Sequence, residues 1–371
     1  MNVLFLSHVR DSKSSNGGMV YSNYILSELR RICARVEVLY VYDDVPTSRK
    51  LKIFIALVRS FFDRLPAKVL YFDRPSVHRA LSKLTAEIHP DIVIFDHLET
   101  AVYIRNLISP KSTVLVQHND EARLYEERLS KISNPITSAV LKSECRKLRR
   151  FQERATALIR NQVFISPDEL ANDAAKKPTV NRLCMLPAFD YEPAARVTRA
   201  EAGQPVHVAF LGNMKWWPNQ DAVDWLISEV IPHVDPDKVV FHLMGAGSDA
   251  ERFQRKNVIG HGFVNQASDI WKKANIFLSP IVSGAGMNVK VAEAIYNRRS
   301  VISTSRGVRG IPLINDPSVI VIDSAAEWIG LLNDQRRLAA LDGQAVLDEN
   351  SSIFDRNSSF ERFRTFLETC K

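Results

Sequence analysis

The stretch that decides the fold is SPIVSGAGMNVKVAEAIYNRRSVISTS, residues 279–305. A short apolar strand pattern leads into it, Gly284, Ala285 and Gly286 predict a turn, and an apolar helical pattern then leads to a second strand pattern. The order strand, turn, helix, strand is typical of a parallel α/β unit. Because such a turn leaves backbone amides open at the start of a helix, the stretch also predicts an anion-binding site.

The helix after this turn carries one cation and one anion, Lys290 and Glu293. Side chains three residues apart share one helix face, so an ammonium can meet a diphosphate while a carboxylate meets a ribose diol. The alternative is a tight turn followed by a surface ion pair, which contributes little. The stretch alone leaves both interpretations open.

Two other segments favour the nucleotide interpretation. FLGNMKWWPNQDAVDWL begins as a strand and turns at Gly212, so Asn213, Met214 and Lys215 are expected to point into the same cleft. HGFV, residues 261–264, precedes a helical pattern and is expected to present backbone groups to a flat base. The alternative for each segment is an ordinary strand-to-helix turn.

Alternating strand and helix patterns extend over both halves of the chain. Strand patterns occur at 2–8, 35–42, 91–97 and 112–119, and again at 206–214, 239–247 and 275–281. The segment 182–205 is rich in Pro and Ala with weak periodicity, which indicates a domain junction. We predict an α/β protein with two doubly wound Rossmann-like domains facing across a cleft at the carboxyl ends of their strands. The predicted limits are 1–187, 188–350 and 351–371, the last a helix packing back toward the N-terminal domain.

Composition narrows the class of protein. The 371 residues suit two domains. A net charge of +7 favours anionic partners without choosing among them. The sequence shows neither an apolar run of about 18 residues nor a basic leader, so we expect a cytoplasmic protein. The four cysteines have no metal-ligand spacing and are expected to be free thiols, and DPD at 235–237 is interpreted as a solvated turn, so no metal site is expected.

The second half resembles a known family through GNMKWWPNQDAVDWLISEVIP, GFV and SPIVSGAGMNVKVAEAIYNRRSVISTSRGVRGI. These segments look like the donor-binding half of retaining glycosyltransferases with the GT-B fold, the large bacterial "glycosyl transferases group 1" type. The first half resembles the family more weakly, through Gly17-Gly18 and QHNDE at 117–121. The resemblance implies a nucleoside-diphosphate sugar, of UDP or GDP type, as donor substrate and no other cofactor.

The resemblance also implies roles for single residues. Lys290 would neutralise the diphosphate, Glu293 would hold the ribose hydroxyls, and His118 would face the donor sugar; these three are the expected catalytic residues. The residues expected to bind the donor are Gly17, Gly18, Gly212, Asn213, Met214, Lys215, Phe263, Val264, Gly284, Ala285, Gly286, Met287, Lys290 and Glu293. Asp96 and His97 are expected at the edge of the same cleft.

The sequence departs from the family at two positions. Ala285 stands where many members have a first glutamate, and Asn213 stands where many have a phosphate-binding arginine. The charge of the phosphates would then rest on Lys290, Lys215 and either Arg306 or Arg309. These departures keep a catalytically degenerate scaffold open as an alternative.

The expected function is transfer of a sugar, with retention and without a metal, to a glycan or lipid-linked acceptor in cell-surface polysaccharide or lipopolysaccharide synthesis. A nucleotide-sugar epimerase is the other enzyme alternative. Nucleic-acid binding is not expected, because the chain has no recognition-helix pattern.

Residues 51–66, LKIFIALVRSFFDRLP, bear on a membrane partner. The interpretation we favour is a helix packed on the sheet, and the alternative is a helix in a membrane interface. With the basic run LKSECRKLRRFQER, residues 141–154, the alternative supports peripheral contact with the anionic inner face of the membrane.

Overall fold

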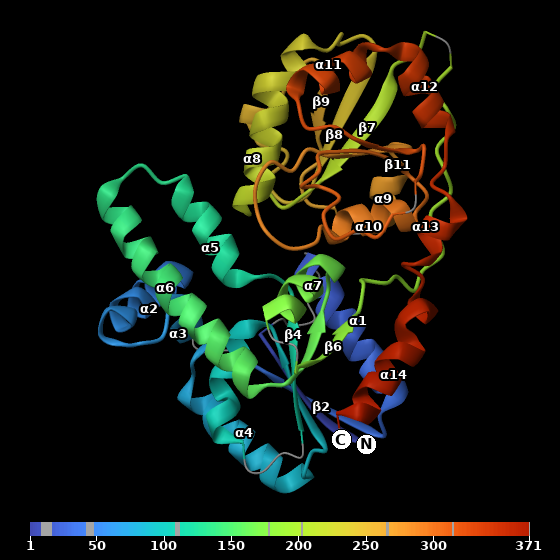
Figure 1. Ribbon diagram of the computed structural model, residues 1–371. Coiled ribbons are helices and arrows are strands. Elements are labelled where there is room, and N and C mark those ends of the chain that lie inside the picture. The colour runs from blue at the N-terminus through green and yellow to red at the C-terminus, as the bar shows by residue number, and fades with distance from the viewer. Residues whose placement is uncertain are drawn as a thin grey trace. The chain divides into compact units, whose positions relative to one another are not determined.

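The computed structural model describes residues 1–8, 17–41, 48–107, 112–176, 179–201, 203–264, 267–313 and 315–370 (Figure 1). The chain forms two compact units. Unit 1 holds the described residues of 1–8, 18–186 and 359–370, and unit 2 holds Gly17 and the described residues of 187–358. Each unit contains one six-stranded parallel sheet with flanking helices, so the prediction of two doubly wound α/β domains is confirmed.

Unit 1 has the strand order β2-β1-β3-β4-β5-β6. Its strands are β1 (Asn2–Ser7), β2 (Arg35–Tyr40), β3 (Ile92–Asp96), β4 (Ser112–Gln117), β5 (Asn161–Phe164) and β6 (Asn181–Cys184). Its helices are α1 (Gly17–Ile32), α2 (Arg49–Phe62), α3 (Ala67–Phe72), α4 (Pro75–Ile88), η1 (Leu98–Asn106), α5 (Glu121–Ser130), α6 (Pro135–Leu158), α7 (Pro167–Lys176) and α14 (Phe360–Thr369). The order reverses between β1 and β3, which makes their carboxyl ends the place where such a sheet binds ligands.

Unit 2 has the strand order β12-β11-β10-β7-β8-β9. Its strands are β7 (Val206–Leu211), β8 (Val239–Met244), β9 (Val258–Gly260), β10 (Ile276–Ser279), β11 (Ser300–Ser303) and β12 (Val319–Val321). Its helices are α8 (Trp217–Trp225), η2 (Leu226–Val230), η3 (Ile231–His233), η4 (Glu251–Phe253), α9 (Ala267–Trp271), α10 (Val289–Tyr296), α11 (Ala325–Asn333), α12 (Gln335–Gly343), α13 (Asp348–Ser352) and η5 (Arg356–Ser359). Here the order reverses between β7 and β10, so the loops after these two strands meet.

The central strands are buried on both faces, as a parallel sheet covered by helices requires. All residues of β3 and β10 are buried. In Figure 1, α1 and α14 lie on one side of the unit 1 strands and α4 and α6 on the other. Helix α14 closes the chain and is grouped with unit 1, where Asn181 of β6 donates to Thr369 at 3.2 Å.

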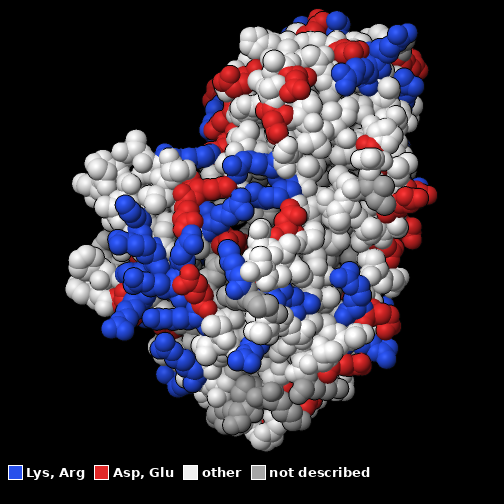
Figure 2. Space-filling view, viewed as in Figure 1, with Lys and Arg blue, Asp and Glu red and all other residues white. Residues whose placement is uncertain are grey.

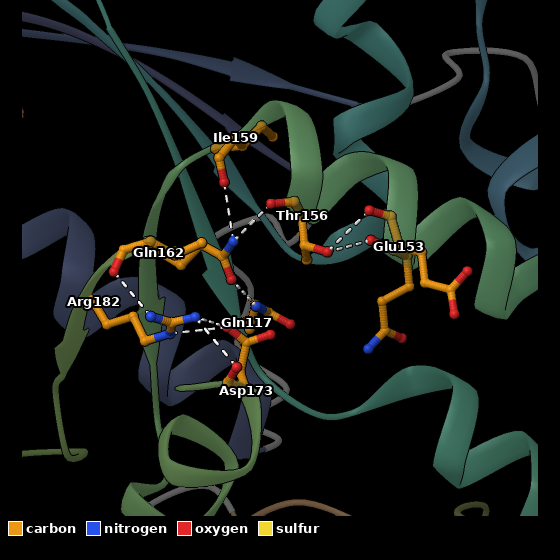
Figure 3. Close-up of polar contacts among 9 residues, drawn as sticks. Gln117, Glu153, Thr156, Ile159, Gln162, Asp173 and Arg182 are labelled. Carbon is orange, nitrogen blue, oxygen red and sulfur yellow. Dashed lines mark hydrogen bonds and ion pairs between the residues drawn. The ribbon is translucent and has the colours of Figure 1, made fainter. Parts of the chain in front are cut away.

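A buried amide ladder ties strands β4 and β5 together in unit 1 (Figure 3). Gln117 Nε2 donates to Gln162 Oε1 at 2.6 Å, and Gln162 Nε2 donates to the carbonyls of Thr156 and Ile159 at 3.1 and 3.0 Å. Both glutamines are buried, so breaking the ladder would leave polar groups unpaired. The ladder fixes the carboxyl end of β4, and the next residue along the chain is His118.

Helix α2 exposes most of its apolar side chains, whereas an ordinary surface helix buries them. Its buried side chains are Ala56 and Ser60, while Phe61 and Phe62 are 82% and 84% exposed. Ser60 Oγ donates to Glu144 Oε1 of α6 at 2.5 Å, so the helix is held through a polar residue. The favoured prediction, a helix whose apolar residues pack on the sheet, is wrong, because those residues face away from the unit.

Two further expectations concern the chain as a whole. The four cysteines carry free thiols, as predicted. Among the described residues, no helix combines the length and the apolar character that a bilayer span requires.

Candidate functional site

The loop after β10 meets the start of α8 at the point where the unit 2 sheet reverses its order. Ser283 Oγ donates to Asp221 Oδ2 at 2.6 Å. A Cβ added to Gly284 would lie 3.0 Å from the Pro218 ring, and the φ of this residue is +98°. Glycine is therefore required at 284 for two reasons, the backbone conformation and the close approach of α8.

Arg309 holds the shape of this loop. Its guanidinium donates to the carbonyl of Gly284 at 3.0 Å and to the carbonyl of Gly286 at 2.9 Å. Arg309 therefore has a structural role in this loop, and the expectation that it also compensates phosphate charge stays a prediction. Nothing in the sequence distinguishes these two uses of an arginine.

The loop offers backbone donors at the N-terminus of α10. Within the described part of the chain, the amides of Ala285, Gly286 and Met287 donate no hydrogen bond. The first amides of α10 add further donors, and the helix dipole points its positive end the same way. A loop of this kind, fixed by Arg309 and open at its amides, can bind an anion.

Lys290 lies one turn beyond the loop without a carboxylate partner among the described residues. Its Nζ donates to Asn219 Oδ1 at 2.8 Å and sits 4.2 Å from the centroid of the Phe210 ring. Burial lowers the pKa of Lys290 to about 7. An ammonium that has been removed from water and has no anion beside it is a strong binding group for a phosphate.

Glu293 lies in a different environment from Lys290. Its Oε1 accepts a hydrogen bond from the Tyr191 hydroxyl at 2.8 Å, and the side chain is 8% exposed. Burial raises the pKa of Glu293 to about 7, although the hydrogen bond from Tyr191 opposes the shift. The alternative of a surface ion pair between Lys290 and Glu293 is wrong, because each side chain has its own neutral partner.

The loop after β7 is held against the loop after β8. Met214 N donates to the carbonyl of Ala246 at 2.9 Å, and a Cβ on Gly245 would lie 2.2 Å from the carbonyl oxygen of Gly212. Asn213 Oδ1 accepts from the amide of Lys215 at 2.9 Å, which makes a local turn.

The loop after β7 corrects one prediction. Met214 is 4% exposed and belongs to the hydrophobic core, so it does not point into a ligand site as expected. Met287 is also buried, while Lys215 is exposed. The sequence did not show that the two methionines are buried, because methionine is common both in cores and in binding sites.

A cavity of about 240 Å³ lies beside the loop after β9. The lining residues are Met244, His261, Phe263, Val264, Asp269 and Lys273. Cavities of roughly 150 Å³ hold a benzene ring, so this one has room for a heterocycle. Two of its walls are Phe263 and Val264, which the sequence pattern had assigned to a base.

A polar cluster occupies the carboxyl ends of β1, β3 and β4 in unit 1. Asp96 accepts from Ser7 Oγ at 2.6 Å and from His118 Nε2 at 2.7 Å. The His118 ring stacks on His97 with centroids 3.5 Å apart, and His97 contacts His8 at 4.2 Å. The structure therefore brings together His118, Asp96 and His97, which the sequence had placed at strand ends.

The charges of this cluster are set by Asp96. Burial would raise the pKa of Asp96, but His97 and His118 outweigh it and hold the pKa well below its usual range. Burial and the charge of His97 lower the pKa of His118 to about 4. Burial would lower the pKa of His97 too, but Asp96 outweighs it and raises the pKa. At neutral pH Asp96 is therefore a carboxylate and His118 is a neutral imidazole. The Nδ1 atom of His118 is buried and has no hydrogen-bond partner among the residues that the structure describes.

The group Asp96, His97 and His118 also has ligand atoms within 4.8 Å of one another, close enough for one metal ion. The two imidazoles are nearly parallel, with 12° between their planes. Parallel rings direct their lone pairs side by side rather than toward one point, which suits hydrogen bonding to hydroxyls better than coordination.

A buried ion triad lies next to this cluster and was not predicted. Lys68 Nζ contacts Glu99 Oε1 and Glu121 Oε2, each at 2.5 Å. The carboxylates come from η1 and the first turn of α5, and the lysine comes from α3. These residues are more than twenty positions apart in sequence, and no local pattern links them.

Gly17 and Gly18 are the first two residues of α1. The loop that precedes them, 9–16, lies outside the described residues. The expectation that they face a diphosphate or acceptor therefore stays a prediction.

Comparisons with known proteins agree with this arrangement. Residues 205–330 match the family described as "Glycosyl transferases group 1". A search of curated protein sequences finds no match. The matched segment begins at β7 and ends in α11, so it contains both loops of the unit 2 site.

Several solved structures share the fold at low sequence identity. Sucrose-phosphate synthase from Thermosynechococcus elongatus has a TM-score of 0.65 at 11% identity, over 100% of this chain and 99% of that one. Anabaena HepE in complex with UDP has a TM-score of 0.63 at 12% identity, over 100% of both chains. The lipopolysaccharide outer core galactosyltransferase WaaB has a TM-score of 0.58 at 14% identity, over 100% and 99%. Residues 205–330 are therefore similar to the group 1 glycosyltransferases, and the chain as a whole has the two-domain GT-B fold of these solved structures.

Proposed function

We propose that the protein transfers a sugar from a nucleoside diphosphate, of UDP or GDP type, to a glycan or lipid-linked acceptor, with retention of anomeric configuration. The cell-surface polysaccharide or lipopolysaccharide pathway is the setting we infer for this reaction. The observation that carries the proposal is the loop 283–287, in which the amides of Ala285, Gly286 and Met287 donate no hydrogen bond among the described residues. Lys290 follows this loop and has no carboxylate partner in the described part of the chain. HepE, a protein of the same fold, is described in complex with UDP.

The chemistry follows from where charge develops. Departure of the nucleoside diphosphate leaves negative charge on the β-phosphate and positive charge on the sugar. Amides of the loop and the ammonium of Lys290 stabilise that phosphate more strongly in the transition state than in the ground state, which is what accelerates the reaction. Because these groups supply the compensating charge, we expect transfer to proceed without a metal cofactor.

The remaining roles in unit 2 follow from the same site. Glu293 would accept hydrogen bonds from the ribose hydroxyls, for which its pKa of about 7 allows a carboxylate at neutral pH and above. The cavity walled by Phe263 and Val264 would hold the base. Lys215, which is exposed on the loop after β7, would contribute a second positive charge.

In unit 1, we assign the sugar-facing role to His118. Its Nδ1 is buried, neutral and without a partner among the described residues, so it can accept a hydrogen bond from a hydroxyl. Asp96 fixes the tautomer, because a carboxylate on Nε2 requires the proton to be there. Asp96 and Ser7 are therefore positioning residues for His118.

A thermal-shift panel with UDP, GDP, TDP and their sugars tests the proposal. We expect at least one of these nucleotides to raise the melting temperature, because it would supply the anion that Lys290 lacks. No shift with any of them would contradict donor binding. A shift without transfer to any acceptor would favour a degenerate scaffold, and conversion of the donor alone would favour an epimerase.

The stereochemistry has its own test, the anomeric configuration of the product by NMR. Retention is the expected result. An inverted product would contradict it and would point to the Asp96–His118 pair as the base that takes the acceptor's proton, since a neutral imidazole oriented by a carboxylate suits that task.

We also propose that α2 places the enzyme on an anionic bilayer, where a lipid-linked acceptor is found. The exposed apolar side chains of this helix are Leu51, Ile53, Phe54, Ile55, Leu57, Val58, Phe61 and Phe62. A patch of this kind on a helix is uncommon for a soluble surface. Lys50, Arg59 and Arg64 are exposed beside it, and Figure 2 shows Lys and Arg side chains gathered over the lobe that holds α2 and α6. Apolar side chains bordered by cations suit a membrane with negative headgroups. A second copy of the chain suits this surface less well, because the two cationic surfaces would repel each other.

Vesicle flotation tests this contact. Wild-type protein should float with vesicles containing phosphatidylglycerol and stay unbound with pure phosphatidylcholine. The double variant Phe61→Ser, Phe62→Ser should bind at least 100-fold more weakly, because each buried aromatic contributes roughly 1.5 to 3 kcal/mol. Both side chains are exposed, so the variant should fold normally. Flotation that is independent of anionic lipid, or a dimer that the double variant dissociates, would contradict the proposal.

A further inference from the structure

Three histidines in unit 2 form a hydrogen-bonded row that no motif predicted. His207 Nδ1 lies 2.8 Å from His242 Nε2, and His242 Nδ1 lies 2.8 Å from His261 Nε2. Adjacent rings are nearly parallel, with centroids 5.1 Å apart in both pairs. Each histidine comes from a different place on the sheet, β7, β8 and the residue after β9.

The row runs from the surface to the cavity. His207 is exposed near the amino end of β7, and His242 is 5% exposed in the middle of β8. His261 follows the carboxyl end of β9 and lines the 240 Å³ cavity. The nitrogen of His261 that remains for a ligand is Nδ1, which has no hydrogen-bond partner among the described residues.

Counting protons along the row restricts its states. Each neutral imidazole carries one N–H, and each of the two internal hydrogen bonds needs one hydrogen. All three rings must therefore be protonated on Nδ1, or all three on Nε2. In the first state His261 offers an N–H to the cavity, and in the second it offers a lone pair. One extra proton can be accommodated, and a second would break a hydrogen bond.

The surroundings of His242 and His261 disfavour the protonated form of both rings. Burial and the other two histidines lower the pKa of His242 to about 3. Burial and Lys273, which lies just beyond α9, lower the pKa of His261. Asp269 of α9 also lines the cavity and is paired with Lys272 at 3.2 Å, while Asp249 lies close to Gly262.

We propose that His207, His242 and His261 form a tautomer relay, through which a keto-bearing heterocycle in the cavity fixes the protonation of His207 at the surface. The keto oxygen would accept from His261 Nδ1–H, and the positive charge of Lys273 at the same wall favours an oxygen over an amino group. This inference rests on the proposed function for the identity of the ligand, a base such as uracil, but the coupling of the three rings does not.

Side-chain ¹⁵N NMR of the unliganded protein tests the coupling. The relay requires the same tautomer at all three rings at any pH where the row is neutral. It also requires that the first proton taken up on acidification is shared by the row, leaving one N–H at each end. The variant His242→Phe keeps a buried ring and should uncouple His207 from His261. Different tautomers at the three wild-type rings would overturn the relay whether or not a nucleotide binds.

The ligand half of the inference is tested with UDP and CDP, which differ by a keto and an amino group on the base. UDP should bind at least tenfold more tightly and move the proton of His207 to Nδ1, and His242→Phe should abolish that change at His207 while UDP still binds. UDP binding without a change at His207 would overturn the relay and leave the donor site standing. Failure of every nucleotide to bind would overturn the donor site and the keto assignment together, and leave the coupling to be decided by the unliganded spectra.

Discussion

Lys290→Ala should lower the turnover number at least tenfold, equivalent to about 1.4 kcal/mol of activation free energy. The physical reason is that the ammonium would neutralise charge which appears on the leaving diphosphate. In the unliganded protein Lys290 contacts an amide oxygen and an aromatic ring, neither of which replaces a phosphate. Steady-state kinetics with the donor identified by thermal shift measures the effect. Lys238→Ala, an exposed lysine directly before the amino end of β8 and at the opposite end of the sheet, is the matched control and should change turnover less than threefold.

The lowered pKa of Lys290 adds a pH dependence with a defined sign. With a pKa of about 7 in the free enzyme, Lys290 is increasingly neutral as the pH rises above 7. A bound diphosphate would raise that pKa, so binding above pH 7 takes up a proton and weakens by up to tenfold per pH unit. Lys290→Arg keeps its charge at these pH values and should remove the dependence. Affinity in the wild type that is flat from pH 6 to 9 would contradict this role.

Glu293→Ala should also lower turnover at least tenfold, because its carboxylate is assigned to the ribose hydroxyls. The sharper measurement compares the nucleotide with its 2′-deoxy form. Wild-type protein should discriminate between the two, and Glu293→Ala should not. The control is Tyr191→Phe, which removes the hydroxyl that donates a hydrogen bond to Glu293 but leaves the Glu293 carboxylate in place. This variant should change turnover less than threefold. Equal discrimination in Glu293→Ala and wild type would show that another group reads the ribose.

Glu293 also carries a stability signature that is independent of activity. Its pKa is raised from 4.5 to about 7, so the native state favours the protonated form. The corresponding stability is present below pH 4.5 and is lost as the pH rises through 7. Glu293→Gln should therefore melt at a higher temperature than wild type at pH 8 and at the same temperature at pH 4.

The fold could be predicted because its signals are local. Apolar runs such as 2–7 and 206–211 are short enough for strands, and they alternate with helical patterns. The turn at Gly284–Gly286 could be predicted for the same reason, and both glycines have positive φ in the structure. The binding of a phosphate there stays a prediction.

The failures have a common cause, which is that partners distant in sequence decide what a side chain does. The structural role of Arg309 could not be predicted, because the carbonyls of Gly284 and Gly286 that it binds are more than twenty residues away. Met214 belongs to the core for the same reason. Helix α2 was misassigned because a strip of Ala56 and Ser60 looks like a solvent face until Glu144 of α6 is brought against it. The histidine row could not be predicted, because its three residues come from β7, β8 and the position after β9, and no local sequence pattern links them.

The central claim is that the bend at 283–287 and the ammonium of Lys290 hold a diphosphate. Calorimetric titration of UDP and uridine, or of GDP and guanosine if that base binds, into wild type and Lys290→Met measures it most directly. The claim predicts that the diphosphate strengthens wild-type binding at least a hundredfold, and that Lys290→Met reduces this factor at least tenfold while the nucleoside affinity stays unchanged. An equal factor in both proteins would contradict it.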